Sequence, residues 1–193
     1  MLLYHRFYGI WPTKVIILSF LALVVWLGLA IALGRWKRGW RCACAAILVA
    51  MLYFIIDMTI LKRSPGDHEL ILQPFRNLIL AFSDSELYRS IVMNTVLFMP
   101  IGMTMPFLLP KSWKRWLRVI VCVVFSVLLS GSIEFFQYRY GLGQAEIDDL
   151  ICNTLGAFLG AIPFMILETT AKWWHFILMK YRTKKEQDTK RPK

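Results

Sequence analysis

The amino-acid sequence predicts an all-α fold, a polytopic membrane helix bundle of about five transmembrane helices. Of the 193 residues, 58% are hydrophobic and 18% are charged, and the mean hydropathy is +0.53. Soluble domains carry about 25% charged residues. The hydrophobic residues also occur in continuous blocks of about 20 residues, which is the length that a helix needs to cross the hydrocarbon core.

Five blocks are predicted to span the membrane, at about 15–33, 42–61, 90–109, 119–138 and 150–167. The first block is longer than a usual signal core and has no convincing cleavage site after it, so we expect a retained helix. The predicted spans can accommodate Pro100, Pro106 and Pro163, because neighbouring helices or water can bond to the backbone carbonyls that each proline leaves without a donor. We divide the chain into an N-terminal helix with a basic loop (1–41), the main membrane domain (42–170) and a basic tail (171–193).

The positions of lysine and arginine predict the orientation. Loops 34–41 and 110–118 and the tail from residue 172 contain sixteen of the 23 basic residues, and the opposite side contains seven. Because cytoplasmic loops are enriched in these residues, we expect a multi-pass cell-membrane protein with its N-terminus outside and its C-terminus in the cytoplasm. In this placement the basic residues behind the net charge of +11 lie next to anionic lipid headgroups, so we expect membrane lipids as partners. We expect no nucleic-acid partner, since no fold or motif for nucleic-acid binding is present.

The four cysteines predict neither a disulfide nor a metal site. Only Cys152 falls near the outer face in this topology, and a single cysteine there has no partner for a disulfide. Cys42 and Cys44 form an isolated C-x-C pair without a further His or Cys ligand. We therefore expect no metal and no cofactor.

Polar residues inside the predicted spans are candidate functional groups, because charged and amide side chains are costly in a bilayer. They recur on four spans within about one helical turn of the outer boundary. The candidate residues are Asp57, Asn94, Glu134, Gln137, Asp148, Asp149 and Asn153, with Arg63, Arg76 and Arg139 in adjoining loops. We predict that they line a polar pocket in the outer leaflet. Two alternatives remain: Asp148 caps a helix start, and Asn94 and Asn153 only bond between helices.

Two glycines on the last predicted span share a face with Asp149 and Asn153. Gly156 and Gly160 have the small-x-x-x-small spacing that allows another helix to approach closely. We interpret this pair as a helix-packing feature.

Four stretches in order resemble the VanZ family. They are Leu-Lys-Arg at 61–63 with Leu-Gln-Pro-Phe-Arg at 72–76, Asn-Thr-Val-Leu-Phe-Met-Pro-Ile-Gly at 94–102, Glu-Phe-Phe-Gln at 134–137, and Asp-Asp-Leu-Ile-Cys-Asn-Thr-Leu-Gly at 148–156. The resemblance implies a role in the cell envelope, typically lowered susceptibility to teicoplanin-like lipoglycopeptides. The family often has an aromatic residue and an arginine where this chain has residues 143–146, so we expect Arg139 to supply the positive charge.

Three hypotheses for function follow. The first is a non-catalytic membrane factor whose pocket binds a lipid headgroup, a lipid-linked cell-wall precursor or a lipoglycopeptide antibiotic. The second is a membrane enzyme that acts on a lipid-linked substrate, with Glu134 and Asp149 as general acid and base or as ligands of a divalent cation. The third is a transporter, which the position of the polar groups away from mid-membrane disfavours. No obvious nucleophile set or metal motif is present, so we prefer the non-catalytic hypothesis.

Overall fold

The computed structural model describes residues 37–63 and 69–170, together with isolated positions between 14 and 29. Within this part of the chain, four helices are long and apolar enough to cross a membrane. The predicted membrane helix bundle is therefore confirmed. The predicted first span, 15–33, lies largely outside the described residues, as does the basic tail, 171–193.

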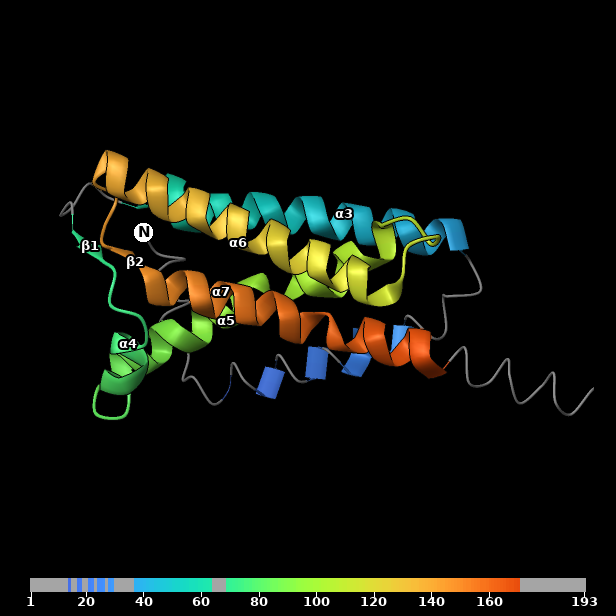
Figure 1. The fold of residues 1–193 in the computed structure, drawn as a ribbon, viewed down its shortest axis with the longest axis horizontal. Helices are drawn as coiled ribbons and strands as arrows, with labels where there is room; N and C mark the ends of the chain where they lie inside the picture. The colour runs from blue at the N-terminus through green and yellow to red at the C-terminus, as the bar shows by residue number, and fades with distance from the viewer. Residues whose placement is uncertain are drawn as a thin grey trace, which may run out of the picture.

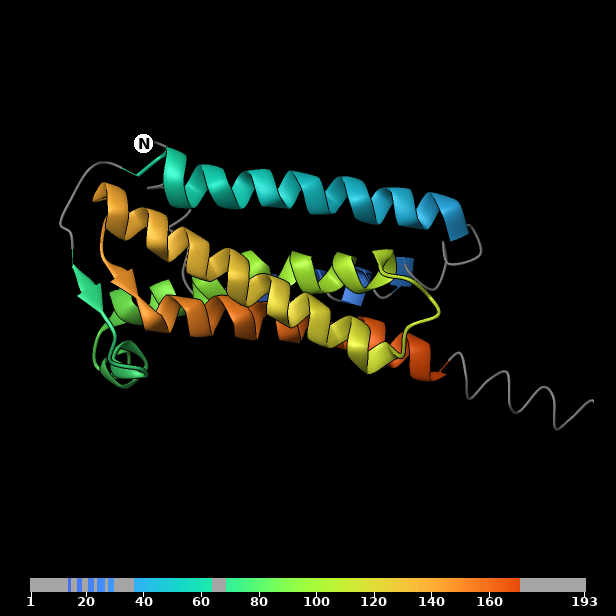
Figure 2. The ribbon, with the colours of Figure 1, turned by 45° about the horizontal axis from the view of Figure 1, so that its top comes forward.

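Four long helices lie side by side, and the short elements gather at one end of the bundle (Figures 1 and 2). We call this end the α4 end. In chain order the elements are α3 (Lys37–Ile56), the π-helix η1 (Asp57–Leu61), β1 (Leu70–Ile71), α4 (Arg76–Leu80), α5 (Ser85–Leu108), α6 (Arg115–Tyr140), β2 (Ala145–Glu146) and α7 (Ile147–Gly160). Strands β1 and β2 form a short parallel pair, in which Leu70 is opposite Ala145 and Ile71 is opposite Glu146.

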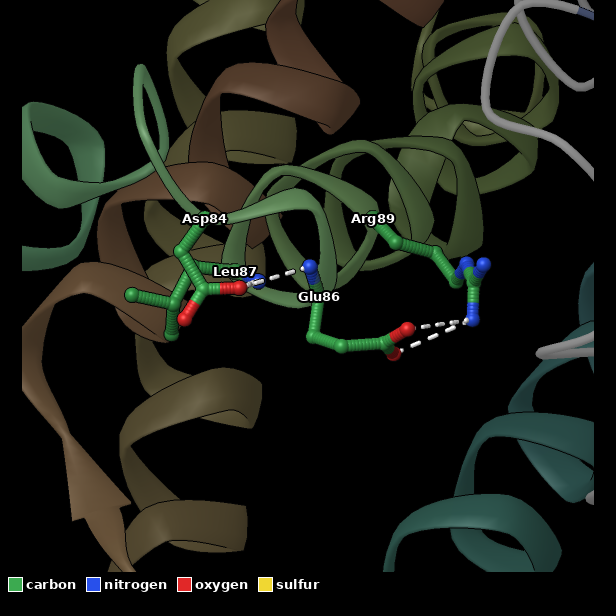
Figure 3. A network of polar contacts seen from close by, with 4 residues as sticks. All are labelled: Asp84, Glu86, Leu87 and Arg89. Atoms are coloured by element: carbon green, nitrogen blue, oxygen red, sulfur yellow. Dashed lines mark hydrogen bonds and ion pairs between the residues drawn. The ribbon is translucent and has the colours of Figure 1, made fainter.

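Helix α5 begins five residues before the predicted position, because a polar cap starts it. Asp84 Oδ1 accepts hydrogen bonds from the backbone N–H groups of Glu86, at 2.8 Å, and Leu87, at 3.4 Å (Figure 3). The Arg89 guanidinium binds the Glu86 carboxylate one turn later, at 3.0 Å. Hydropathy detects the apolar part of a span, whereas capping side chains decide where the helix begins.

The other end of α5 is capped by two arginines. A proline has no backbone N–H, so the carbonyl four residues before it lacks its usual helical hydrogen-bond donor. Pro110 leaves the carbonyl of Pro106 without a donor in this way. Arg118 of α6 donates to Pro106 O from Nε, at 2.9 Å, and from Nη2, at 2.6 Å. Arg41 of α3 donates to Leu108 O at 2.8 Å. Cations are also favoured at the negative end of the helix dipole.

Helices α5 and α7 form the most extensive contact in the bundle, and glycines set their separation. A Cβ atom on Gly156 would lie 1.8 Å from Thr95 O, and one on Gly160 would lie 2.0 Å from Met99 O. Opposite them, a Cβ on Gly102 would lie 1.9 Å from Ala157 O. The predicted packing role of Gly156 and Gly160 is confirmed, and Gly102 is a further member of this interface.

The other predicted spans differ from the structure at their ends. The second span extends from Lys37 and finishes in η1, and the fourth covers 115–140 rather than 119–138. The last span begins at Ile147 and has a turn at Ala161, after which helical backbone continues over 162–170. The turn precedes Pro163, whose ring removes a backbone donor.

An aromatic series packs the end opposite α4. Trp26, from the predicted first span, donates from Nε1 to Met103 O at 3.0 Å, and its ring lies 4.7 Å from that of Trp40. The series continues through Phe107 to Phe164, over whose ring Arg118 lies at 4.4 Å. This end is therefore closed by packed rings and an arginine, whereas the carboxylates discussed below lie at the other.

Candidate functional site

Four carboxylates come together at the α4 end, and we call Glu134, Glu146, Asp148 and Asp149 the carboxylate cluster. Glu134 reaches from α6 to β2, where its Oε2 accepts the backbone N–H of Glu146 at 2.9 Å. The charges of Glu134 and Asp149 act on each other, and so do those of Asp149 and Glu146. Glu134 and Asp149 each keep part of their residue surface exposed.

Asp148 is buried and holds the loop before α4. Its two carboxylate oxygens accept the backbone N–H groups of Phe75, at 2.5 Å, and Asn77, at 2.7 Å. Phe75 has a left-handed backbone, with φ 64°, which is costly for a residue with a side chain. The carboxylate stabilises this conformation. Asp148 therefore caps a helix start, as one alternative anticipated, but the helix is α4 rather than its own.

Arg63 brings a positive charge to three of the four carboxylates of the cluster. Its charge acts on Glu134, Glu146 and Asp149, and its Nη1 donates to Leu142 O at 3.5 Å. Gly143 makes room for the guanidinium, since a Cβ there would lie 2.7 Å from Nη1, and its φ of 122° also favours glycine. Arg139, the expected source of this charge, is exposed and lies over the ring of Tyr140 at 5.8 Å.

Two asparagines lie between the helices beside the cluster. Asn94 of α5 lies next to the Asp149 side chain. Asn153, one turn below Asp149 on α7, donates from Nδ2 to Ser130 Oγ at 2.9 Å. Ser130 is one turn below Glu134 on α6, so a polar pair lies beneath the two carboxylates. Asn153 Oδ1 is buried and has no partner among the described residues.

Gln137 contacts the π-helix η1, and Asp57 is its first residue. Gln137 is buried and donates from Nε2 to Thr59 O in η1 at 3.0 Å. Asp57 forms an ion pair with Lys62 in its own segment. The structure thus gives Gln137 a role in joining α6 to η1 and gives Asp57 a local partner.

Glu146 was not among the residues selected from the sequence, although it lies only two positions before Asp148. Its carboxylate accepts a hydrogen bond from Asn77 Nδ2. Burial raises the pKa of Glu146 above its ordinary value, while the Asn77 hydrogen bond and the positive charges of Arg76 and Arg63 oppose that shift. The sequence did contain a signal for Glu146, because it adds a third carboxylate next to the Asp148–Asp149 pair.

The arrangement suits recognition of a polar or cationic group at the end of a membrane bundle. Carboxylates outnumber the arginines that face them, and amide groups add hydrogen-bonding capacity. Two neighbouring carboxylates can also exchange protons with a bound group. Among the described residues, no group of three or more His, Cys, Asp and Glu side chains is arranged to hold a metal ion.

Most of this chain matches a known protein family. The family model described as VanZ/LLP1 matches residues 42–168. Protein VanZ of Enterococcus faecium is 32% identical over 73 residues, which are 38% of this chain and 42% of that protein. The chain thus aligns with less than half the length of this relative, and no solved structure matches it. Since the family model covers more than half of the sequence, the chain belongs to the VanZ/LLP1 family.

Proposed function

We propose that this protein lowers the susceptibility of a bacterial cell envelope to teicoplanin-like lipoglycopeptides, through a polar pocket around Glu134 and Asp149 in the outer leaflet. The observation that carries the proposal is the convergence of carboxylates, asparagines and Arg63 at one end of a membrane bundle. Membership of the VanZ/LLP1 family supports it.

The charge distribution supports the outer-leaflet position. Loop 110–118, at the end opposite α4, and loop 34–41 are rich in lysine and arginine, as cytoplasmic loops are. In this orientation the α4 end faces outward, where it meets lipid headgroups, lipid-linked cell-wall precursors and antibiotics that act on them.

The acyl chain of teicoplanin gives a physical reason for selectivity. It anchors the antibiotic near the outer leaflet, and burial of such a chain contributes about 0.8 kcal/mol per methylene. Each methylene therefore changes an equilibrium constant about fourfold. A small change in the access of the antibiotic to the leaflet thus alters its binding severalfold. Vancomycin has no such anchor.

Expression in a susceptible Gram-positive host tests the proposal. We expect the minimum inhibitory concentration of teicoplanin to rise severalfold, and that of vancomycin to rise less. A matched strain with the empty vector is the control. An unchanged teicoplanin value, with the protein detected in the membrane, would contradict the proposal.

A second candidate function is an enzyme that acts on a lipid-linked envelope substrate. The observation that favours it is the mutual influence of the Glu134 and Asp149 charges, an arrangement that general acid and base pairs use. The variant Glu134→Gln separates the candidates: an enzyme loses its effect completely, whereas a binding protein is only weakened.

A further inference from the structure

The segment before α5 carries a patch of apolar side chains that the bundle does not cover. We call residues 69–84, which contain β1 and α4, the α4 segment. Its exposed large apolar side chains, between 42% and 93% accessible, are Leu70, Leu72, Phe75, Leu78, Ile79, Leu80 and Phe82. An apolar patch of this kind marks a surface that meets a membrane or another molecule.

The α4 segment is held firmly although its outer face is free. Asp148 binds two of its backbone N–H groups, and Asn77 hydrogen-bonds to Glu146. The pairing of β1 with β2 fixes its beginning, and Ala145 donates to Glu69 O at 2.9 Å. The apolar side chains are therefore presented outward by a fixed backbone.

The position of the segment indicates what covers the patch. Helix α4 packs against α5 and α7 beside their first turns, which begin at Ser85 and Ile147 (Figures 1 and 2). The patch is thus at the level where two membrane spans start, and Tyr88 in the first turn of α5 is exposed as well. The lipid that surrounds those spans is the partner that lies next to it.

The charged residues beside the patch limit how deeply it can enter the bilayer. Arg76, Asp84 and Glu86 are exposed close to the apolar side chains. Charged groups are costly in the hydrocarbon core but are readily accepted among headgroups. The segment fits the boundary between headgroups and acyl chains, where amphipathic segments lie flat with one face buried.

We propose that the α4 segment inserts its apolar face into the interfacial region of the bilayer and so fixes the depth of the carboxylate cluster relative to the headgroups. Asp148 and Glu146 belong to that cluster and bind the segment directly. Movement of the segment in the interface therefore moves groups adjoining Glu134 and Asp149. This inference does not depend on the role in teicoplanin tolerance.

Depth measurements on labelled full-length protein test this inference. The background is Cys42→Ser, because Cys42 is exposed and the other three cysteines are buried. Ile79→Cys and Phe82→Cys carry an environment-sensitive fluorophore in vesicles of phosphatidylcholine and phosphatidylglycerol. Gln144→Cys is the control, since Gln144 is exposed and polar at the same end. Unchanged midpoints of thermal unfolding show that each variant is folded.

We expect lipids with a nitroxide near the headgroup to quench the labels at 79 and 82 more than lipids with a deep nitroxide. Aqueous iodide should quench the label at 144 severalfold more than either of them. Three results would overturn the inference: iodide quenching at 79 and 82 equal to that at 144, strongest quenching by the deep nitroxide, or self-quenching between protein copies. The last would assign the patch to a second copy of the chain.

Discussion

Gly156→Ala is expected to lower the stability of the bundle strongly, although it adds a single methyl group. The new Cβ would lie 1.8 Å from the carbonyl oxygen of Thr95, so α5 and α7 would have to separate. Overpacking typically costs about 1–3 kcal/mol. Because lipid chains are as apolar as the side chains they replace, close backbone packing is a main source of helix association in a membrane.

Gly131→Ala is the matched control for Gly156→Ala. A Cβ at Gly131 would lie 3.6 Å from Leu150 Cδ1, an ordinary van der Waals distance. Alanine is also favoured over glycine inside a helix by about 1 kcal/mol. Thermal unfolding of the purified proteins in detergent should show a lower midpoint for Gly156→Ala and an equal or higher one for Gly131→Ala. Equal midpoints for both variants would show that the α5–α7 contact does not limit stability.

Arg118→Ala is expected to cause the second large loss of stability. The guanidinium makes two hydrogen bonds to Pro106 O, binds Glu168 at 3.3 Å and lies over Phe164. Its removal leaves the carbonyl and the carboxylate without their cation, for a loss of about 3 kcal/mol. Arg118→Lys should restore only part of this stability, because an ammonium cannot reproduce the planar fork of donors.

Arg115→Ala is the matched control, since Arg115 lies one turn earlier on the same helix. Its Nη1 donates to Thr169 Oγ1 at 2.8 Å at an exposed position, so we expect a change within about 0.5 kcal/mol. The measurement is again the midpoint of thermal unfolding in detergent. A decrease of similar size in both arginine variants would contradict the specific role of Arg118.

The sequence was sufficient to predict the four spans that the structure describes, because a bilayer selects helices by the same hydropathy and length that the sequence displays. It was less informative about their ends. The start of α5 depends on the Asp84 cap, and α3 already begins at Lys37, among basic residues that precede the apolar block. Neither feature changes the apolar periodicity.

The candidate site was predicted by residue type and depth, but the partners were not. Asp148 binds backbone groups more than 70 residues earlier in the chain, so no local pattern could reveal its role. Gly102 became recognisable only when its contact with α7 was visible. Arg63 was selected because it lies in a loop next to the polar ends of the spans, and the loop glycine that accommodates it, Gly143, explains why this arginine faces the carboxylates.

The teicoplanin susceptibility of carboxylate variants tests the central claim most directly. Glu134→Ala and Asp149→Ala are compared with Glu86→Ala, whose carboxylate is exposed at the same end and pairs with Arg89 outside the carboxylate cluster. At equal amounts of protein in the membrane, we predict that the first two variants lose the tolerance of the parent protein. The third should keep it. Full tolerance in Glu134→Ala and Asp149→Ala would contradict a functional site at the carboxylate cluster.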